Sequence, residues 1–228
     1  MNFQRYAIFF TPDDGPFSEF GARWLGWDIE TGTARAHPEI SGLPAPVAQL
    51  TKSPRRYGFH ATLKPPFRLA QGHNISDLHT ETGALASQIA PICLPKLELV
   101  ALGRFLVLVA PPPAQDLINL ASTFVRELDG FRAPPSAQEL AARRKPHLTP
   151  SQNGNLTEWG YPFVMDDFRF HITLTCPLAK PERASALAAL APVLEKVVPR
   201  PFSIASVTLA GECDQGRFHQ ISKHPLSG

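Results

Sequence analysis

Two five-residue segments of almost identical sequence, Phe59–Leu63 (FHATL) and Phe170–Leu174 (FHITL), lie about half a chain apart in the 228-residue sequence. The order of elements around them repeats too. Each half is predicted to run strand, helix, irregular helical segment, histidine strand, helix and hairpin. A repeat of this length is too long for a solenoid of short units. It therefore predicts one domain, residues 1–228, made of two related lobes that each carry one segment.

Short apolar runs separated by proline and glycine define the expected elements. The 24 prolines are about twice the average share and mostly fall between these runs, Pro65-Pro66 after the first histidine strand among them. Residues 143–160 are polar, with a turn signal at Asn153-Gly154. The expected strands are 5–10, 59–63, 97–102, 105–109, 168–175, 202–209 and 218–221. The expected helices are 17–25, 47–50, 75–89, 117–128, 134–142 and 181–198. This pattern predicts an α+β fold of two pseudo-symmetric lobes, whose mainly antiparallel sheets face a central cleft.

Charge and cysteine content exclude several protein classes. Lys and Arg number 22 and Asp and Glu number 20, so the net charge is +2, which does not favour duplex nucleic acid as a partner. The three cysteines form no CxxC pair, which argues against a disulfide framework or a structural zinc site. We find no signal peptide and no apolar run long enough to span a membrane. We therefore expect a cytoplasmic protein without a membrane partner.

The two histidine strands each present one polar and one apolar face, because strand side chains alternate. The apolar faces are expected to anchor each strand in its core. The polar faces need water or a ligand, since a buried unpaired histidine or threonine is costly. If the lobes face each other, both polar faces meet in one cleft. The residues on these faces are His60, Thr62 and Lys64 in the first strand and Arg169, His171, Thr173 and Thr175 in the second.

These residue types suit phosphodiester cleavage without a metal or any other cofactor. Two histidines across a cleft can divide the roles of general base and general acid. Threonine hydroxyls can donate hydrogen bonds to the non-bridging phosphate oxygens, and Lys64 and Arg169 would add positive charge. A metal site is a poorer reading, because zinc needs three or four ligands and only Asp166 or Asp167 could supplement the histidines.

Three stretches around these strands resemble a known family: RYAIFF, YGFHATLKPPF and WGYPFVMDDFRFHITLTCPL. Together with the paired His-x-Thr motifs, they resemble the 2H phosphoesterase superfamily, specifically an uncharacterised branch often encoded beside phosphonate-metabolism genes. The resemblance covers nearly the whole chain. It implies the bilobal fold with a central cleft that 2H phosphoesterases and RNA ligases of this type share. It also implies that His60 and His171 are catalytic and that Thr62 and Thr173 bind phosphate, but it does not define the substrate.

Further residues are candidates for substrate binding. Tyr57 and Tyr161 lie close in sequence to the histidine strands and would stack on a base or touch phosphate, unless they only pack. The basic run Arg143-Arg144-Lys145 is either a grip for a second phosphate or a solvated charge run.

The sequence leaves three functions open. The first is hydrolysis of a cyclic phosphodiester, with a small nucleotide or a ribosyl phosphate as substrate and a link to phosphonate metabolism. The second is binding of a nucleotide or an RNA end without catalysis. The third is RNA 2′,5′-ligation, which uses the same residues in reverse and would need a longer basic groove. The sequence does not predict the oligomeric state.

Overall fold

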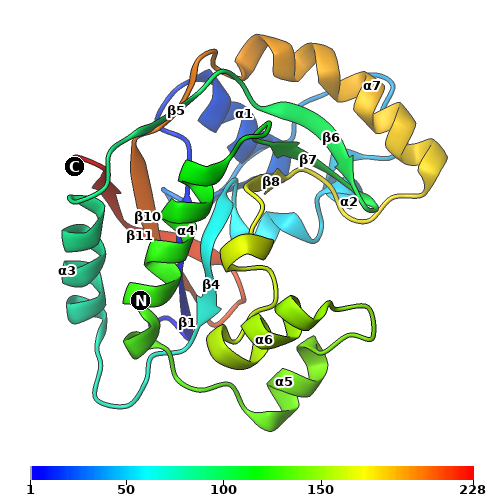
Figure 1. Cartoon of the computed structure of the whole chain (residues 1–228). Coiled ribbons are helices and arrows are strands. Elements are labelled where there is room, and N and C mark those ends of the chain that lie inside the picture. The colour runs from blue at the N-terminus through cyan, green and yellow to red at the C-terminus, as the bar shows by residue number, and fades with distance from the viewer. Residues whose placement is uncertain (1) are drawn as a thin grey trace.

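The computed structural model describes residues 2–228, which form an α+β fold around one seven-stranded antiparallel sheet (Figure 1). The strand order across this sheet is β11-β10-β1-β4-β8-β7-β6. Its strands are β1 (Arg5–Phe10), β4 (Ala61–Phe67), β6 (Glu98–Leu102), β7 (Phe105–Val109), β8 (His171–Thr173), β10 (Ser206–Glu212) and β11 (Phe218–Pro225). Two small antiparallel pairs accompany it, β2 (Trp27–Asp28) with β3 (Thr33–Ala34) and β5 (Ile92–Leu94) with β9 (Phe202–Ile204).

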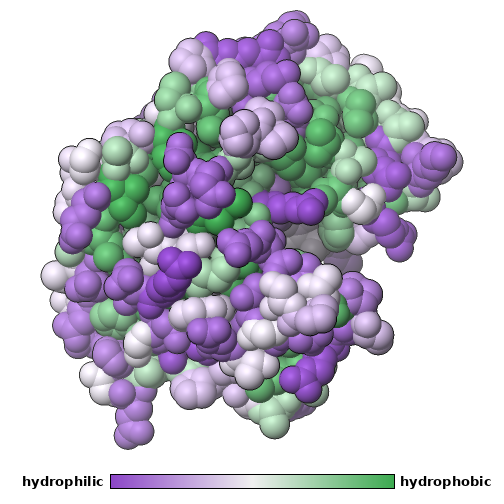
Figure 2. Space-filling model, viewed as in Figure 1, coloured by the Kyte–Doolittle hydropathy of each residue, from purple (hydrophilic) through white to green (hydrophobic). Residues whose placement is uncertain are grey.

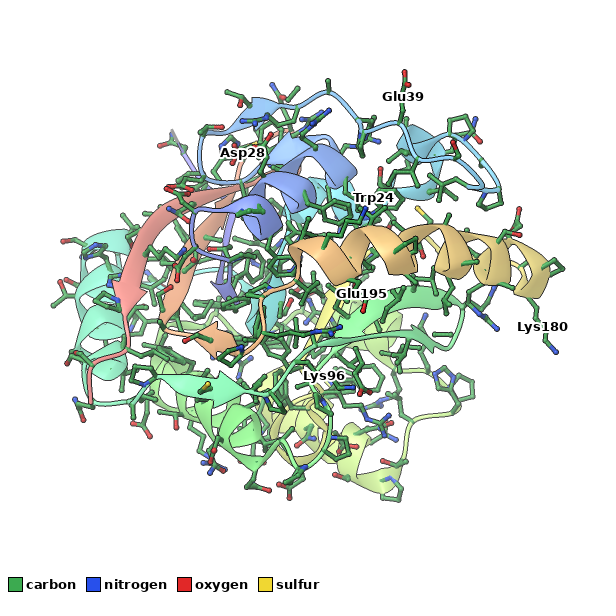
Figure 3. All side chains as sticks on the ribbon, turned by 90° about the horizontal axis from the view of Figure 1, so that it is seen from above. Trp24, Asp28, Glu39, Lys96, Lys180 and Glu195 are labelled. Atoms are coloured by element: carbon green, nitrogen blue, oxygen red, sulfur yellow. The ribbon has the colours of Figure 1, made fainter. Side chains whose placement is uncertain are left out.

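The helices of the described residues lie mainly on one side of this sheet. They are α1 (Pro16–Leu25), α2 (Val47–Leu50), α3 (Ile75–Ala86), α4 (Gln115–Glu127), α5 (Ala137–Arg143), α6 (Pro150–Trp159) and α7 (Lys180–Val197), with short 3-10 turns at Pro54–Tyr57 (η1), Asp129–Phe131 (η2) and Met165–Asp167 (η3). From above, α1 and α7 lie side by side with Trp24 next to both (Figure 3). The fully buried Trp24 indole donates a hydrogen bond to the Leu174 carbonyl at 2.8 Å, which ties α1 to the end of β8.

The two faces of the sheet are covered very differently, as β1 shows. Tyr6, Ile8 and Phe10 face a large core that includes residues of α1, α3, α4 and α7. Ala7 and Phe9 face the opposite way, into a small cluster completed by Ile29, Ala210 and Phe218. Because side chains alternate along a strand, the second face carries the odd-numbered positions of β1. This sparsely covered face is the one on which the histidines lie.

The two halves of the chain exchange their hairpins. The β6–β7 hairpin belongs to the first half, yet it pairs with β8 of the second half. The β10–β11 hairpin belongs to the second half, yet it pairs with β1 of the first. The two histidine strands, β4 and β8, are neighbours at the centre of the sheet, with Ala61 opposite Ile172. The sequence halves therefore interleave in one continuous sheet.

The first histidine strand runs on through its two prolines, although the sequence predicted that Pro65-Pro66 would end it. Proline in a sheet is tolerated at edges and bulges, because it has no N–H to donate. The pairing of β4 with β8 is recorded only at Ala61, and the β1–β4 register shifts between Ile8 and its neighbours. The prolines therefore lie where β4 is unpaired on one side and irregular on the other. The second histidine strand is shorter than predicted, because only residues 171–173 pair.

Most predicted helices are confirmed within a few residues, and α2 is confirmed at both ends. The predicted turn at Asn153-Gly154 was wrong, because both residues lie inside α6. A capping box starts this helix: the Thr149 side chain accepts from the Gln152 N–H, and the Gln152 side chain accepts from the Thr149 N–H. Gly160 ends it in the left-handed conformation, with φ of 73°. None of the helices within residues 2–228 has the length and apolar character that crossing a bilayer requires.

Candidate active site

The two His-x-Thr motifs meet in a crossed arrangement on the sparsely covered face of the sheet, which we call the open face. Extending the Ala61–Ile172 register by one residue in each direction places His60 opposite Thr173 and Thr62 opposite His171. Residues directly opposite in an antiparallel pair point to the same face and lie about 5 Å apart, and diagonal neighbours lie about 7–8 Å apart. His60 and His171 are such diagonal neighbours. A group the size of phosphate can therefore lie between the two imidazoles with a threonine hydroxyl on each flank.

Each imidazole is oriented by a hydrogen bond of the same kind, to the main-chain carbonyl two residues earlier. His60 Nδ1 lies 2.9 Å from the carbonyl oxygen of Gly58, and His171 Nδ1 lies 2.7 Å from that of Arg169. A carbonyl oxygen only accepts, so Nδ1 is the protonated nitrogen in each ring. The Nε2 atom of each ring is then the nitrogen available to exchange a proton with a ligand. His60 Nε2 lies 3.1 Å from the Thr62 hydroxyl, which can donate to it until a ligand takes its place.

Aromatic rings enclose His60 on the sheet. Its ring lies 4.0 Å from the Phe9 ring and 5.6 Å from the Tyr57 ring, measured between centroids, and Tyr57 stacks in turn on Phe218 at 5.1 Å. Burial lowers the pKa of His60 to about 4, against the opposing effect of the Gly58 hydrogen bond, and the proximity of His171 lowers it further. His60 is therefore neutral at pH 7.

Lys64 does not share the face of Thr62, contrary to the prediction from strict alternation. The register shift in the β1–β4 pair places Lys64 opposite Ile8, a residue of the large core. Its ammonium is buried, donates to the Val125 carbonyl at 2.9 Å and lies 3.7 Å from the Asp129 carboxylate. Burial lowers its pKa to about 8, although Asp129 opposes this effect. Lys64 therefore ties β4 to the end of α4.

Arg169 and the two tyrosines lie around the histidine pair. Arg169 is exposed and precedes β8, and its carbonyl orients His171. Tyr57 is half-buried and stacks on His60. Tyr161 is also half-buried, and its pKa is raised by burial and by nearby Tyr57. The structure thus brings both tyrosines to the same region as the histidine pair.

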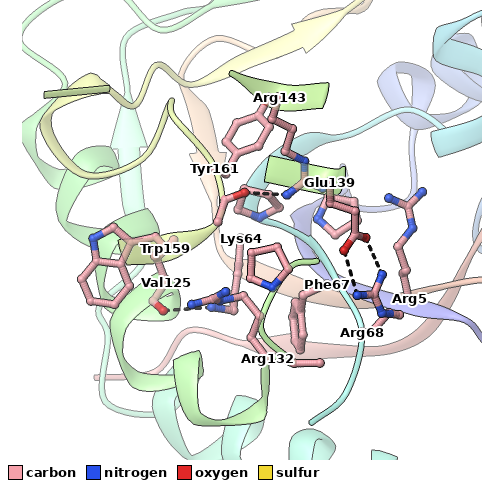
Figure 4. A pocket seen from close by; sticks show the side chains of 15 residues that line it. Arg5, Lys64, Phe67, Arg68, Val125, Arg132, Glu139, Arg143, Trp159 and Tyr161 are labelled. Carbon is pink, nitrogen blue, oxygen red and sulfur yellow. Dashed lines mark hydrogen bonds and ion pairs between the residues drawn. The ribbon is translucent and has the colours of Figure 1, made fainter. Parts of the chain in front are cut away.

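An arginine-rich pocket adjoins this region at the end of β4 that follows the histidine motif (Figure 4). Arg5, Arg68, Arg132 and Arg143 line it together with Tyr161. Arg5 lies on the same face of β1 as Ala7 and Phe9, and its pKa is influenced by Tyr57. Sequence reasoning did not place Arg5, Arg68 or Arg132 in a site. Only the alternation in β1 carried a signal, since it groups Arg5 with Phe9.

A scan against protein-family models matches residues 62–219 to one family, described as a protein of unknown function, DUF1045. That match covers more than half of the chain. The chain belongs to the DUF1045 family. The matched region of this DUF1045 protein contains Thr62, His171, Thr173, Arg68, Arg132 and Arg143.

Two curated relatives match the DUF1045 chain over much of its length. One is "Ribose 1,5-bisphosphate phosphokinase PhnN" from Janthinobacterium sp. (strain Marseille), 35% identical over 98% of this chain and 51% of the relative. Another, of the same name, is from Laribacter hongkongensis (strain HLHK9), 32% identical over 81% of this chain and 43% of the relative. The chain thus spans about half the length of the curated relatives it matches. Among solved structures, Escherichia coli LigT complexed with NADP+ matches at 15% identity over 100% of both chains, with a TM-score of 0.47.

Within residues 2–228, no group of three or more His, Cys, Asp or Glu side chains is placed to hold a metal ion. Asp167 accepts hydrogen bonds from Ser151, Gln152 and Asn155, so its carboxylate holds α6 to η3.

Proposed function

We propose that this chain is a 2H-type phosphoesterase that hydrolyses a cyclic phosphodiester of a small nucleotide or ribosyl phosphate without a metal. One observation supports this above the others: Ala61, between His60 and Thr62, pairs with Ile172, between His171 and Thr173, and His171 is close enough to influence the pKa of His60. Two oriented imidazoles and two hydroxyls at this spacing provide a base, an acid and two donors to phosphate oxygens.

The proposed reaction is a single displacement at phosphorus. A water molecule loses a proton to Nε2 of one histidine as its oxygen forms a bond to phosphorus. The bond from phosphorus to one ring oxygen breaks, and Nε2–H of the other histidine gives its proton to that oxygen. The Thr62 and Thr173 hydroxyls donate to the non-bridging oxygens as negative charge builds up on them. The product is a phosphomonoester with a free hydroxyl, and proton exchange with solvent restores the histidines.

We assign the base role to His60. Its lowered pKa keeps the ring neutral, so Nε2 can accept a proton at physiological pH. Tyr57 and Phe9 enclose the ring and sustain this low pKa by keeping water away from it. His171 then acts as the acid. Its Nδ1 is engaged with the Arg169 carbonyl, so the proton that it transfers is the one on Nε2.

The comparisons favour a pentose phosphate among the candidate substrates. The curated relatives are named for ribose 1,5-bisphosphate, a ribose with two phosphates. Opening a cyclic phosphate on a ribosyl phosphate gives a product of that chemical class. The sequence resemblance to the branch found beside phosphonate-metabolism genes points the same way. Nucleoside 2′,3′-cyclic phosphates stay in the candidate set, because Tyr57 offers a ring on which a base can stack.

Phosphorus-31 NMR on purified protein tests this proposal with a panel of substrates. The panel contains nucleoside 2′,3′-cyclic phosphates and ribose 1,2-cyclic phosphates, each with and without a 5-position phosphate. We expect the cyclic phosphate signal of at least one compound to convert to a phosphomonoester signal, at the same rate with and without EDTA. Saturable binding without any product would support a nucleotide- or RNA-end-binding protein instead. Joining of RNA ends without hydrolysis would support RNA 2′,5′-ligation.

A further inference from the structure

The arginine-rich pocket beside the histidine pair contains more cations than its carboxylates neutralise. Five cationic side chains line it, Arg5, Lys64, Arg68, Arg132 and Arg143, and Glu139 is the one acidic side chain among the lining residues. The carboxylates that contact these cations from outside the lining are Glu212 and Asp129. A concave surface with excess positive charge attracts an anionic group.

The ion pairs hold the guanidinium groups in place without using all of their donors. Arg5 donates to Glu212 through Nε and Nη2, which leaves Nη1. Arg68 donates to Glu139 through both terminal nitrogens, which leaves Nε. Each guanidinium has five N–H donors in a planar fork that matches a phosphate. These arginines are therefore fixed but still have N–H groups to offer.

Arg143 is the least neutralised of these cations. Its Nη1 donates to the Gly160 carbonyl at 2.5 Å, which fixes the end of α5 against the end of α6. Among the residues that the structure describes, no carboxylate lies within ion-pair distance of Arg143. Figure 4 shows its side chain next to Tyr161 at the pocket. The next residue, Arg144, is exposed and does not line the pocket.

The pocket lies close enough to the histidines for one sugar phosphate to contact both. Arg5 and Phe9 share one face of β1, and four residues of strand span about 14 Å. Phe9 contacts His60, and the pocket lining includes Pro65, three residues along β4 from Thr62, which is about 10 Å of strand. Tyr57 is close to both places, since it stacks on His60 and influences the pKa of both Arg5 and Tyr161. One ligand can therefore reach both places.

We propose that this pocket binds a second, non-reacting phosphate of the substrate, held by Arg143 and the free donors of Arg5. This inference rests on the proposed function, because it needs a reacting phosphate at the histidine pair. It narrows the substrate class to cyclic phosphodiesters that also carry a phosphomonoester several bonds away. The near-neutral net charge of the chain fits this class, because a few placed arginines replace a general basic surface.

The test compares two matched pairs of substrates. One pair is adenosine 2′,3′-cyclic phosphate with and without a 5′-phosphate, and the other is ribose 1,2-cyclic phosphate with and without a 5-phosphate. We expect wild-type protein to show a kcat/KM at least tenfold higher for the member with the second phosphate in at least one pair. In Arg143→Gln this preference should fall by about tenfold or more, the usual effect of losing a charge-assisted hydrogen bond. Arg144→Gln removes the same charge from the neighbouring exposed residue and should keep the wild-type preference.

Equal kcat/KM for both members of each pair would overturn the second-phosphate site while leaving the phosphoesterase proposal intact. If Arg143→Gln lowers kcat/KM equally for both substrates of a pair, the second-phosphate site is also overturned, since that result indicates a structural role at the α5–α6 junction. Turnover of none of the four compounds, combined with equal binding of adenosine 3′-phosphate and adenosine 3′,5′-bisphosphate in calorimetry, would overturn it as well. Turnover of none with tighter binding of the bisphosphate would support the site and count only against the proposed reaction.

Discussion

At the scale of single residues, the site depends on one kind of hydrogen bond that occurs at both histidines. Each histidine has its Nδ1 proton bound by the carbonyl two residues earlier, Gly58 for His60 and Arg169 for His171. This arrangement holds Nε2 toward the open face in both rings. The sequence predicted the two histidines and threonines and their shared face. It could not predict the crossed pairing, because register depends on which strands become neighbours.

The threonines are expected to contribute through their hydroxyls alone. Thr62→Val and Thr173→Val keep the side-chain shape but remove a donor to the phosphate oxygens. We expect each to lower kcat by about 10- to 1000-fold, as for other donors to a developing oxyanion, with little change in melting temperature. Thr157→Val on the exposed side of α6 is the control and should leave kcat unchanged. Wild-type kcat in both site variants would remove the threonines from the mechanism.

Burial of His60 should make the fold sensitive to acid. Its pKa is about 4 in the folded protein and near 6.5 in an unfolded chain, so the unfolded state binds more protons between these values. The free energy of unfolding should therefore fall as the pH drops from about 6.5 toward 4, with no such loss above 6.5. Denaturant titrations at pH 7 and pH 5 should show a loss in wild type that is smaller in His60→Asn, by up to about 2 kcal/mol.

His147→Asn, at an exposed loop position, should lose as much stability as wild type between the two pH values. If His60→Asn also loses as much as wild type, the assignment of a lowered pKa to His60 is wrong.

At the scale of elements, the histidine strand is held by close packing against α1. A Cβ atom added at Gly21 would come within about 2 Å of the Phe59 ring, and Phe59 directly precedes His60. Gly21 therefore lets α1 approach the start of β4. The sequence predicted both elements but not this contact, because long-range packing leaves no local pattern. The missed helix α6 did have a local signature, the capping box at Thr149 and Gln152.

We therefore expect Gly21→Ala to destabilise the protein. The added methyl group overpacks the contact with Phe59, which costs about 1–3 kcal/mol and should lower the melting temperature by roughly 2–12 °C in a chain of this size. Gly154→Ala is the matched control within α6, where nothing lies within 4 Å of the added atom. It should leave the melting temperature unchanged or raise it, since alanine favours a helix over glycine. An unchanged melting temperature in Gly21→Ala would show that α1 and Phe59 are not closely packed at this point.

At the scale of the whole molecule, the exchanged hairpins make the two halves depend on each other. The β6–β7 hairpin pairs with β8, and β10 pairs with β1, so each side of the central sheet needs strands from both halves. The repeat in the sequence predicted two related lobes, but the repeat alone cannot distinguish exchanged from unexchanged hairpins. The net charge of +2 likewise gave no indication that several arginines line one pocket. Figure 2 shows that hydrophilic and hydrophobic residues are interspersed over the face in view.

Fragments cut in the loop after Lys145 should therefore not fold alone. We expect residues 1–145 and 146–228 to lack a cooperative thermal transition when separate and to recover one when mixed. Circular dichroism with temperature measures both. A cooperative transition in the isolated 1–145 fragment would contradict the dependence of each half on the other.

The histidine pair itself is tested by the rate at which His60→Ala and His171→Ala open the ring of a cyclic phosphate that wild type hydrolyses. Each substitution removes a general acid or base, so each should lower kcat by about 10²- to 10⁴-fold. Because the two groups act as a unit, the double variant should be little slower than the slower single variant. His147→Ala should retain wild-type kcat. Retention of wild-type kcat in His60→Ala or His171→Ala would contradict the two-histidine mechanism.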